Sequence, residues 1–177
     1  TLHVGAGTFK PLGDGEISAH EMHAEEIILS RDWLKNYLGH NGDKFAVGTT
    51  SLRTLESCHW IGVKLMTSGT LENLGQFDAY ELDQNTSTSE AYKVLLDHLE
   101  ENGIESMALQ TQLMIRPGYN MKSVQGIITN FHQPGSTLLL LVSAGIGERW
   151  EEVYQYALDN DYRFLSYGDS SLLYFNR

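Results

Sequence analysis

The sequence is poor in cysteine and in basic residues. Cys58 is the single cysteine among 177 residues, so the chain forms no intramolecular disulfide. This usage suits a reducing compartment and predicts a cytoplasmic location. Only 12 Lys and Arg accompany 23 Asp and Glu, giving a formal net charge of −11. Because an acidic surface repels phosphates, the charge balance argues against nucleic-acid binding by this chain alone.

Long hydrophobic runs are also missing. The longest apolar segment, TLLLLVSAGIG at 137–147, is shorter than the roughly 18 residues of a membrane span, so no membrane association is expected. The start of the sequence has no basic segment followed by an apolar run, so no signal peptide is expected either. Its first residue is Thr1 rather than methionine, which suggests a fragment. The length fits one domain, 1–177, with a core of its own.

Strand-like and helix-like patterns alternate along the chain. Apolar periodicity and capping residues predict helices at 30–39, 49–57, 87–103, 132–145 and 148–162. Short apolar runs predict strands at 23–29, 44–48, 106–115, 124–131 and 163–168. The alternation predicts an α/β fold with a mostly parallel sheet, or a partial α/β barrel, flanked by helices. Strand-to-helix loops normally carry the function of such folds.

The first candidate site is the opening loop of TLHVGAGTF. Gly5 and Gly7 let the backbone approach a ligand closely, and Thr8 adds a hydroxyl beside Phe9. The glycine spacing is not that of a dinucleotide-binding loop, so an ordinary tight turn remains an alternative.

A second candidate is the segment HEMHAEE at 20–26. His20 and His23 are three residues apart, and Glu25 follows. A histidine near a carboxylate can titrate close to neutral pH, which suits proton transfer or substrate contact. Metal binding and a solvated surface are the alternatives, but no HExxH motif or third histidine at a standard spacing is present, so no metal is predicted.

The segment AVGTTSLRTLES at 46–57 is a third candidate. Thr49, Thr50 and Ser51 begin a predicted helix, whose free backbone N–H groups and dipole favour an anion. Arg53, one turn further, could add a bidentate contact to a carboxylate or phosphate. Simple capping by the hydroxyl residues is the alternative.

Two further segments follow predicted strands. In ITNFHQPGST, Asn130, Phe131 and His132 stand where a buried strand ends, which favours a role in a site. In SYGDSS, Asp169 either caps a turn or reaches that site. No nucleophile triad is indicated, because no serine lies in a G-x-S-x-G setting and Cys58 falls within a helix.

Five segments in this order resemble one family. TLHVGAGTF, HEMHAE, AVGTTSLRTLES, GIITNFHQPGSTLLLLVSA and YRFLSYGDSSLL are similar to the S-adenosylmethionine:tRNA ribosyltransferase-isomerase family of queuosine synthesis, over residues 1–173. Members of that family are about twice as long, so the resemblance implies the C-terminal portion of the catalytic domain. It further implies that the N-terminal part and an inserted β-barrel domain are absent, and that the fragment alone is inactive.

The resemblance also implies an activity. The family transfers and isomerises the ribosyl group of S-adenosylmethionine onto 7-aminomethyl-7-deazaguanine in tRNA, giving epoxyqueuosine, adenine and methionine. On this reading His20, His23, Glu25 and His132 are candidates for proton transfer. Arg53 and Thr49–Ser51 would hold the methionine carboxylate, the loop at Gly5–Phe9 the ribose or adenine, and Asn130 and Phe131 would add cofactor contacts.

Two positions depart from the family pattern. Gly135 stands where the family usually has a lysine, and Arg116 where an aromatic residue is common. A tRNA-facing patch on this chain would have to form around Arg53, Arg116 and Lys122. A divergent module that binds a nucleoside or anion without ribosyl transfer therefore remains a second hypothesis, and a small metalloprotein a third. Strand edges without their neighbours also predict self-association.

Overall fold

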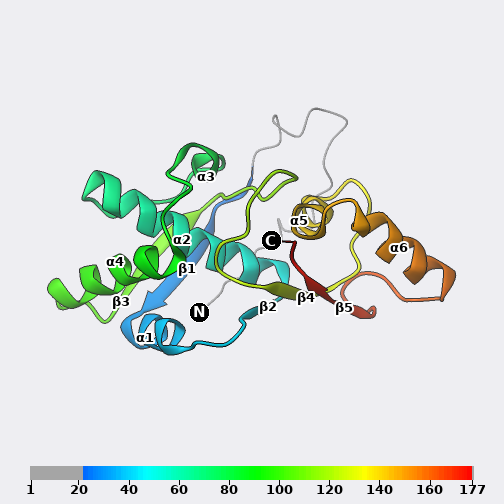
Figure 1. Ribbon diagram of the computed structural model, residues 1–177, viewed down its shortest axis with the longest axis horizontal. Helices are drawn as coiled ribbons and strands as arrows, with labels where there is room; N and C mark the ends of the chain where they lie inside the picture. The colour runs from blue at the N-terminus through cyan, green and yellow to red at the C-terminus, as the bar shows by residue number, and fades with distance from the viewer. Residues whose placement is uncertain (1–21, 177) are drawn as a thin grey trace.

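The computed structural model describes residues 22–176 (Figure 1). Its strands are β1 (Glu25–Ser30), β2 (Phe45–Val47), β3 (Ser106–Thr111), β4 (Gly126–Asn130) and β5 (Ser170–Tyr174). Its helices are α1 (Arg31–Gly39), α2 (Thr49–Ser68), α3 (Asp78–Glu81), α4 (Thr88–Glu101), α5 (Thr137–Ile146) and α6 (Arg149–Asp159). In the described part, no helix is both long and apolar enough to span a membrane.

The strands form two small sheets. β1 pairs with β3 in antiparallel orientation, and the second sheet has the order β2–β4–β5. The predicted α/β class is confirmed, but the expectation of a mostly parallel sheet is wrong. Only β2 and β4 run parallel, while β5 runs antiparallel to β4. β5 runs antiparallel because the chain turns back where β4 ends. There, Leu165 N donates a hydrogen bond to the carbonyl of Phe131, and β5 then pairs with β4 in the opposite direction. The described strands form no closed barrel.

The predicted helices are all present, and local chemistry explains their starts. The Ser30 side chain accepts a hydrogen bond from Trp33 N and caps α1. Ser87 and Glu90 form a complete capping box at α4. The predicted strand at 163–168 is wrong, because these residues form a tight turn in which a Cβ on Gly168 would lie 2.2 Å from the carbonyl oxygen of Arg163.

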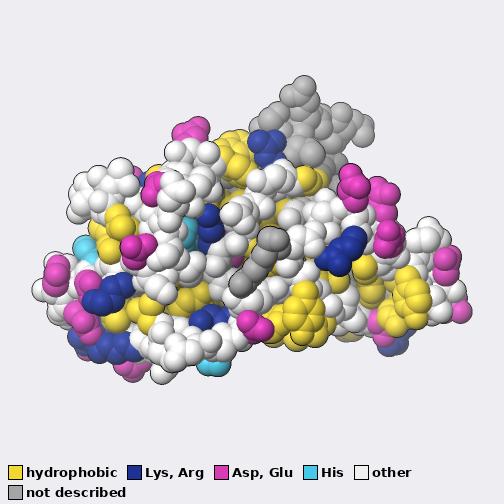
Figure 2. Space-filling view, viewed as in Figure 1, with side chains coloured by type: hydrophobic (Ala, Val, Ile, Leu, Met, Phe, Trp, Pro, Cys, Tyr) yellow, Lys and Arg dark blue, Asp and Glu magenta, His cyan; other side chains and the backbone are white. Residues whose placement is uncertain are grey.

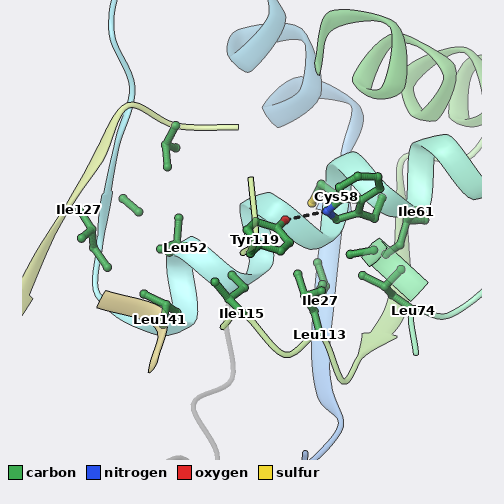
Figure 3. Packing of buried hydrophobic residues seen from close by; sticks show 14 of the residues in the cluster. Ile27, Leu52, Cys58, Ile61, Leu74, Leu113, Ile115, Tyr119, Ile127 and Leu141 are labelled. Atoms are coloured by element: carbon green, nitrogen blue, oxygen red, sulfur yellow. Dashed lines mark hydrogen bonds between the residues drawn. The ribbon is translucent and has the colours of Figure 1, made fainter. Parts of the chain in front are cut away.

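Helix α2 lies at the centre of the molecule and is buried along most of its length (Figure 1). Leu52, Cys58 and Ile61 project from α2 into the hydrophobic core shown in Figure 3. The core also contains Tyr119, whose hydroxyl accepts a hydrogen bond of 2.6 Å from Trp60 Nε1 (Figure 3). Burial of these apolar side chains supplies the main stabilising free energy, about 25 cal/mol per Å² removed from water.

A buried carboxylate connects α2 to the loop before β4. Glu56 accepts hydrogen bonds from Tyr119 Oη, Lys122 N and Ser123 N at 2.8, 2.9 and 2.8 Å. Burial raises the pKa of Glu56, and the three hydrogen bonds act in the opposite direction by stabilising the anion. The loop is thereby fixed against the helix without an ion pair.

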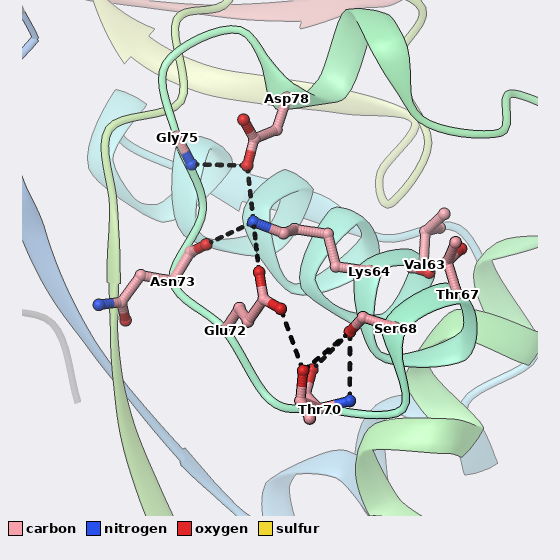
Figure 4. Close-up of polar contacts among 9 residues, drawn as sticks. All are labelled: Val63, Lys64, Thr67, Ser68, Thr70, Glu72, Asn73, Gly75 and Asp78. Atoms are coloured by element: carbon pink, nitrogen blue, oxygen red, sulfur yellow. Dashed lines mark hydrogen bonds and ion pairs between the residues drawn. The ribbon is translucent and has the colours of Figure 1, made fainter.

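A second polar cluster fixes the chain that follows α2. Lys64 Nζ lies 2.9 Å from the carbonyl oxygen of Asn73 and 2.9 Å from Asp78 Oδ2, with Glu72 at 3.3 Å (Figure 4). The same Asp78 carboxylate accepts a hydrogen bond from Gly75 N. These contacts fold the segment between α2 and α3 back against α2, away from the carboxyl ends of β2 and β4.

Candidate functional site

A cavity of about 410 Å³ opens at the carboxyl ends of β2 and β4. Because these two strands are parallel, the chain leaves both at the same edge of the sheet. The junction from β2 to α2 forms one wall, and the junction from β4 to α5 forms another. Leu165 and Ser166 of the turn before β5 complete the lining. The edge is the place where α/β proteins commonly bind ligands.

The start of α2 presents backbone donors to this cavity. Its N-cap residue is Gly48, with a φ of 86° and no side-chain capping hydrogen bond. The backbone N–H of Gly48 instead donates to the carbonyl of Ile128 at 2.8 Å, which ties the loop to β4. Thr49, Thr50 and Ser51 all line the cavity, as the prediction of a shared site requires. Capping by their hydroxyls is not what forms the helix start, so the positive end of the dipole of α2 faces the space.

Arg53 lies one turn deeper and forms a buried ion pair with Glu25. Arg53 Nε donates to Glu25 Oε2 at 3.2 Å, and Arg53 Nη2 contacts Glu25 Oε1. The arginine also borders a small chamber of about 20 Å³, beside Thr49 and Thr50. The two predicted site residues are therefore brought together, but as partners of each other. Since each compensates the other's charge, removing one would leave a buried charge behind.

His132 lines the cavity and is held from two sides. Its Nε2 lies 2.9 Å from Thr129 Oγ1, and its backbone N–H donates to Tyr154 Oη at 3.1 Å. Burial lowers the pKa of His132 to about 4, because the charged ring would lose its hydration. The imidazole is therefore neutral near pH 7 and has a fixed orientation.

The neighbours of His132 point in different directions. Asn130 lines the cavity, and its amide Nδ2 lies 3.3 Å from the carbonyl oxygens of Gly168 and Asp169. Phe131 does not line it. Its ring is buried and packs edge-on against Tyr154, with 5.4 Å between the ring centroids. Alternation of side chains along the strand accounts for this difference. The structure thus brings Asn130 to the site but leaves Phe131 in the core.

His23 is the one histidine of the HEMHAEE segment that the structure describes. His23 is exposed just before β1 and does not line the cavity. His20, Gly5, Gly7, Thr8 and Phe9 lie outside the described residues. Within residues 22–176, no group of three or more His, Cys, Asp and Glu is placed to hold a metal ion.

The predicted basic patch does not form an open cationic surface. Arg53 is buried in its ion pair, and the Arg116 guanidinium lies over the ring of Tyr80, 5.4 Å from its centroid. Lys122 Nζ donates to the carbonyl of Gln84 at 2.8 Å. Each cation is engaged within the fold.

Asp169 caps a turn rather than reaching the cavity. Its Oδ2 accepts a hydrogen bond of 2.8 Å from the backbone N–H of Arg163, which lowers the pKa of this carboxyl. Sequence reasoning missed the other lining residues. Thr129 lies next to the end of β4, and its hydroxyl is shown as the partner of His132 only by the structure. Leu165 and Ser166 fall in the segment that the sequence wrongly predicts as a strand. The cavity is also lined by Val47, Gln133, Ser136 and Leu138.

Comparisons with known proteins relate this chain to one family. A family profile described as "Queuosine biosynthesis protein" matches residues 1–173. The S-adenosylmethionine:tRNA ribosyltransferase-isomerase of Cupriavidus metallidurans is 37% identical over 177 residues, covering 98% of this chain and 39% of that protein. A relative of the same name from Erythrobacter litoralis is 38% identical and covered to 40%.

One solved structure supports the same relationship. The S-adenosylmethionine tRNA ribosyltransferase of Thermotoga maritima aligns with a TM-score of 0.53 at 28% identity, over 84% of this chain and 40% of that one. The chain thus spans about two fifths of the length of the curated relatives it matches. With a family profile matched over nearly all of its residues, this chain belongs to the queuosine biosynthesis protein family.

Proposed function

We propose that this chain forms part of an enzyme that transfers and isomerises the ribosyl group of S-adenosylmethionine onto 7-aminomethyl-7-deazaguanine in tRNA. Epoxyqueuosine would form, and adenine and methionine would leave. The observation that carries the proposal is a single cavity between the open N-terminus of α2 and the neutral, oriented His132. The names of the curated relatives include S-adenosylmethionine and tRNA, which supports these two as substrates. This function requires no metal, and a cytoplasmic location follows from the tRNA substrate.

The cavity offers an anion site and a proton-transfer group. In the proposed reaction the N–H groups at Thr49–Ser51 hold the carboxylate of the methionine portion, with Arg53 behind them. The sulfonium acidifies the adjacent ribose carbon, so a base must remove that proton, and the departing adenine gains from protonation. A neutral imidazole can accept a proton. With a pKa of about 4, the resulting imidazolium also gives the proton up readily.

Within this proposal the role of Glu25 changes from proton transfer, while the other candidates keep their predicted roles. Glu25 acts on the site through Arg53, since the two form a buried pair. His20 and His23 remain candidates for a second proton-transfer step, and Gly5–Phe9 for contact with the ribose or adenine. Because the chain spans about two fifths of its relatives, the activity belongs to the complete protein.

A second candidate function is a module that binds a nucleoside or anion without ribosyl transfer. The specific observation is Gly135, which replaces the lysine usual in the family. Gly135 has a φ of 68°, a conformation that disfavours lysine, and a Cβ added there would meet no atom within 4 Å. The backbone conformation of the loop before α5 therefore favours glycine over lysine at position 135.

Adenine release from S-adenosylmethionine in the presence of precursor-modified tRNA distinguishes the two functions. For the complete polypeptide we expect turnover by the native sequence and a loss of about 10²- to 10⁴-fold in His132→Gln, which keeps a hydrogen-bonding amide but cannot carry the proton. The exposed His40→Gln is the matched control and should retain full turnover. No adenine above background from the native sequence would leave only the binding module, and full turnover in His132→Gln would remove the role of His132.

A further inference from the structure

The turn before β5 carries an exposed aromatic ring beside the cavity. Gly168 N donates to the carbonyl of Leu165 at 2.9 Å, so Ser166 and Tyr167 occupy the two corner positions of this turn. Leu165 and Ser166 line the cavity, and Tyr167 follows directly. The side chain of Tyr167 is 97% exposed. A large aromatic surface is thus presented to solvent next to the candidate site.

Tyr167 differs from the other exposed tyrosines of the described part. The ring of Tyr156 lies 6.1 Å from that of Tyr162, and the ring of Tyr174 packs against Phe45 at 5.1 Å. Tyr162 also meets the buried ring of Phe131 at 5.7 Å. Among residues 22–176, Tyr167 alone of these exposed tyrosines has no ring partner, so both faces of its ring are open.

Hydrogen bonds hold this turn in a conformation with backbone strain at Leu165. Leu165 has a φ of 69°, in the left-handed region that a branched side chain rarely adopts and that costs about 1–3 kcal/mol. The surrounding contacts enforce it: Leu165 N donates to Phe131 O at 2.9 Å, and Asp169 N donates to Arg163 O at 2.7 Å. The Asn130 amide further binds the Gly168 carbonyl. Strain that the surroundings maintain in this way is typical of functional sites.

We propose that Tyr167 is a stacking platform for an unpaired nucleobase of the tRNA substrate at the mouth of the cavity. The inference rests on the proposed function, and it deepens it by naming a residue that contacts the RNA. Proteins recognise single-stranded RNA by stacking splayed bases on exposed aromatic rings. The chain, with a net charge of −11, offers little attraction to phosphates, whereas stacking on an uncharged ring does not depend on that attraction. The position of the ring at the tip of the turn favours the larger substrate over S-adenosylmethionine inside the cavity.

The test compares Tyr167→Ala with Tyr167→Phe in the complete polypeptide, with Tyr156→Ala as the matched exposed-tyrosine control. Binding of fluorescently labelled, precursor-modified tRNA is measured alongside binding of S-adenosylmethionine. We expect Tyr167→Ala to raise the Kd for tRNA about 5- to 150-fold while the Kd for S-adenosylmethionine is unchanged. Tyr167→Phe and Tyr156→Ala should bind tRNA as the native protein does. Because stacking releases no counterions, the ratio of Kd values should be the same at about 50 and 200 mM salt.

The outcomes separate this inference from the proposed function. Unchanged tRNA binding in Tyr167→Ala, or an effect confined to S-adenosylmethionine, overturns the stacking role even where the native protein releases adenine. Loss of tRNA binding in Tyr167→Ala supports it even where no adenine is released, in which case the proposed reaction alone fails. Absence of tRNA binding by the native protein overturns both.

Discussion

His59 is a buried histidine for which the fold provides no partner. Neither ring nitrogen has a hydrogen-bond partner within the described residues, and the ring packs edge-on against Trp60 with 4.7 Å between the ring centroids. Burial lowers the pKa of His59 to about 4, with a smaller contribution from the positive charge of Lys122. An unsatisfied buried polar group costs about 1–3 kcal/mol, so this residue lowers stability. It lies on α2 but does not line the candidate site.

This arrangement predicts a pH-dependent loss of stability. The pKa of His59 is lower in the folded protein than in the unfolded chain, so between pH 6.5 and 4 the unfolded chain binds more protons. The contribution of His59 therefore leaves the free energy of unfolding unchanged above pH 6.5 and lowers it as the pH drops toward 4. His59→Leu should raise the free energy of unfolding by about 1 kcal/mol at pH 7 and flatten this dependence in urea denaturation. The exposed His40→Leu should leave the slope as it is, and an equally steep slope in His59→Leu would contradict the assignment.

At the scale of secondary structure, α4 depends on its capping box. Ser87 Oγ accepts from Glu90 N at 3.2 Å, and Glu90 Oε2 accepts from Ser87 N at 2.9 Å. Loss of the serine hydroxyl leaves a backbone donor at the helix start without its acceptor. We expect Ser87→Ala to lower the free energy of unfolding by about 1 kcal/mol. Ser89→Ala, two residues away on the exposed side, should change it by less than about 0.5 kcal/mol. Equal effects of the two substitutions in urea denaturation would argue against the cap.

The capping box also shows how far the sequence predicts the elements. Helix starts depend on residues within one turn, so Ser30 and Ser87 could be recognised directly. Pairing of strands depends on the path of the chain between them. The turn that brings β5 back beside β4 is fixed by contacts of Asn130 and Asp169 across some 40 positions, which no local pattern reveals.

In the candidate site, too, local features could be predicted from the sequence and contacts between distant residues could not. Thr49–Ser51, Asn130 and His132 were predictable because each lies at or just after the carboxyl end of a strand, and the structure brings them to one cavity. The pairing of Arg53 with Glu25 was not, since these residues lie 28 positions apart on different elements. The sequence placed both charges near the site, but only the fold shows that they compensate each other.

At the scale of the whole molecule, one face of the β2–β4–β5 sheet lacks a covering layer within the described residues. Val47, Ile128 and Leu172 lie side by side in register across the three strands, and all three are exposed. Tyr174, two residues after Leu172 on β5, is exposed on the same face. Figure 2 shows hydrophobic side chains gathered over β4 and β5. The opposite face, with Ile127 and Leu173, is packed in the core. Contiguous exposed apolar surface of this kind mediates association.

We therefore expect the 177-residue chain to self-associate through this face. Light scattering at increasing concentration should give a mass above that of one chain, 19.9 kDa. Leu172→Lys places a charge in the middle of the apolar row on an edge strand, where lysine opposes further pairing, and should return the mass to one chain. Leu158→Lys, an equally apolar and exposed change on α6, should leave the association intact. A native chain that stays at 19.9 kDa throughout would show that the exposed row alone does not drive association, and dissociation by Leu158→Lys would place the contact on α6 instead.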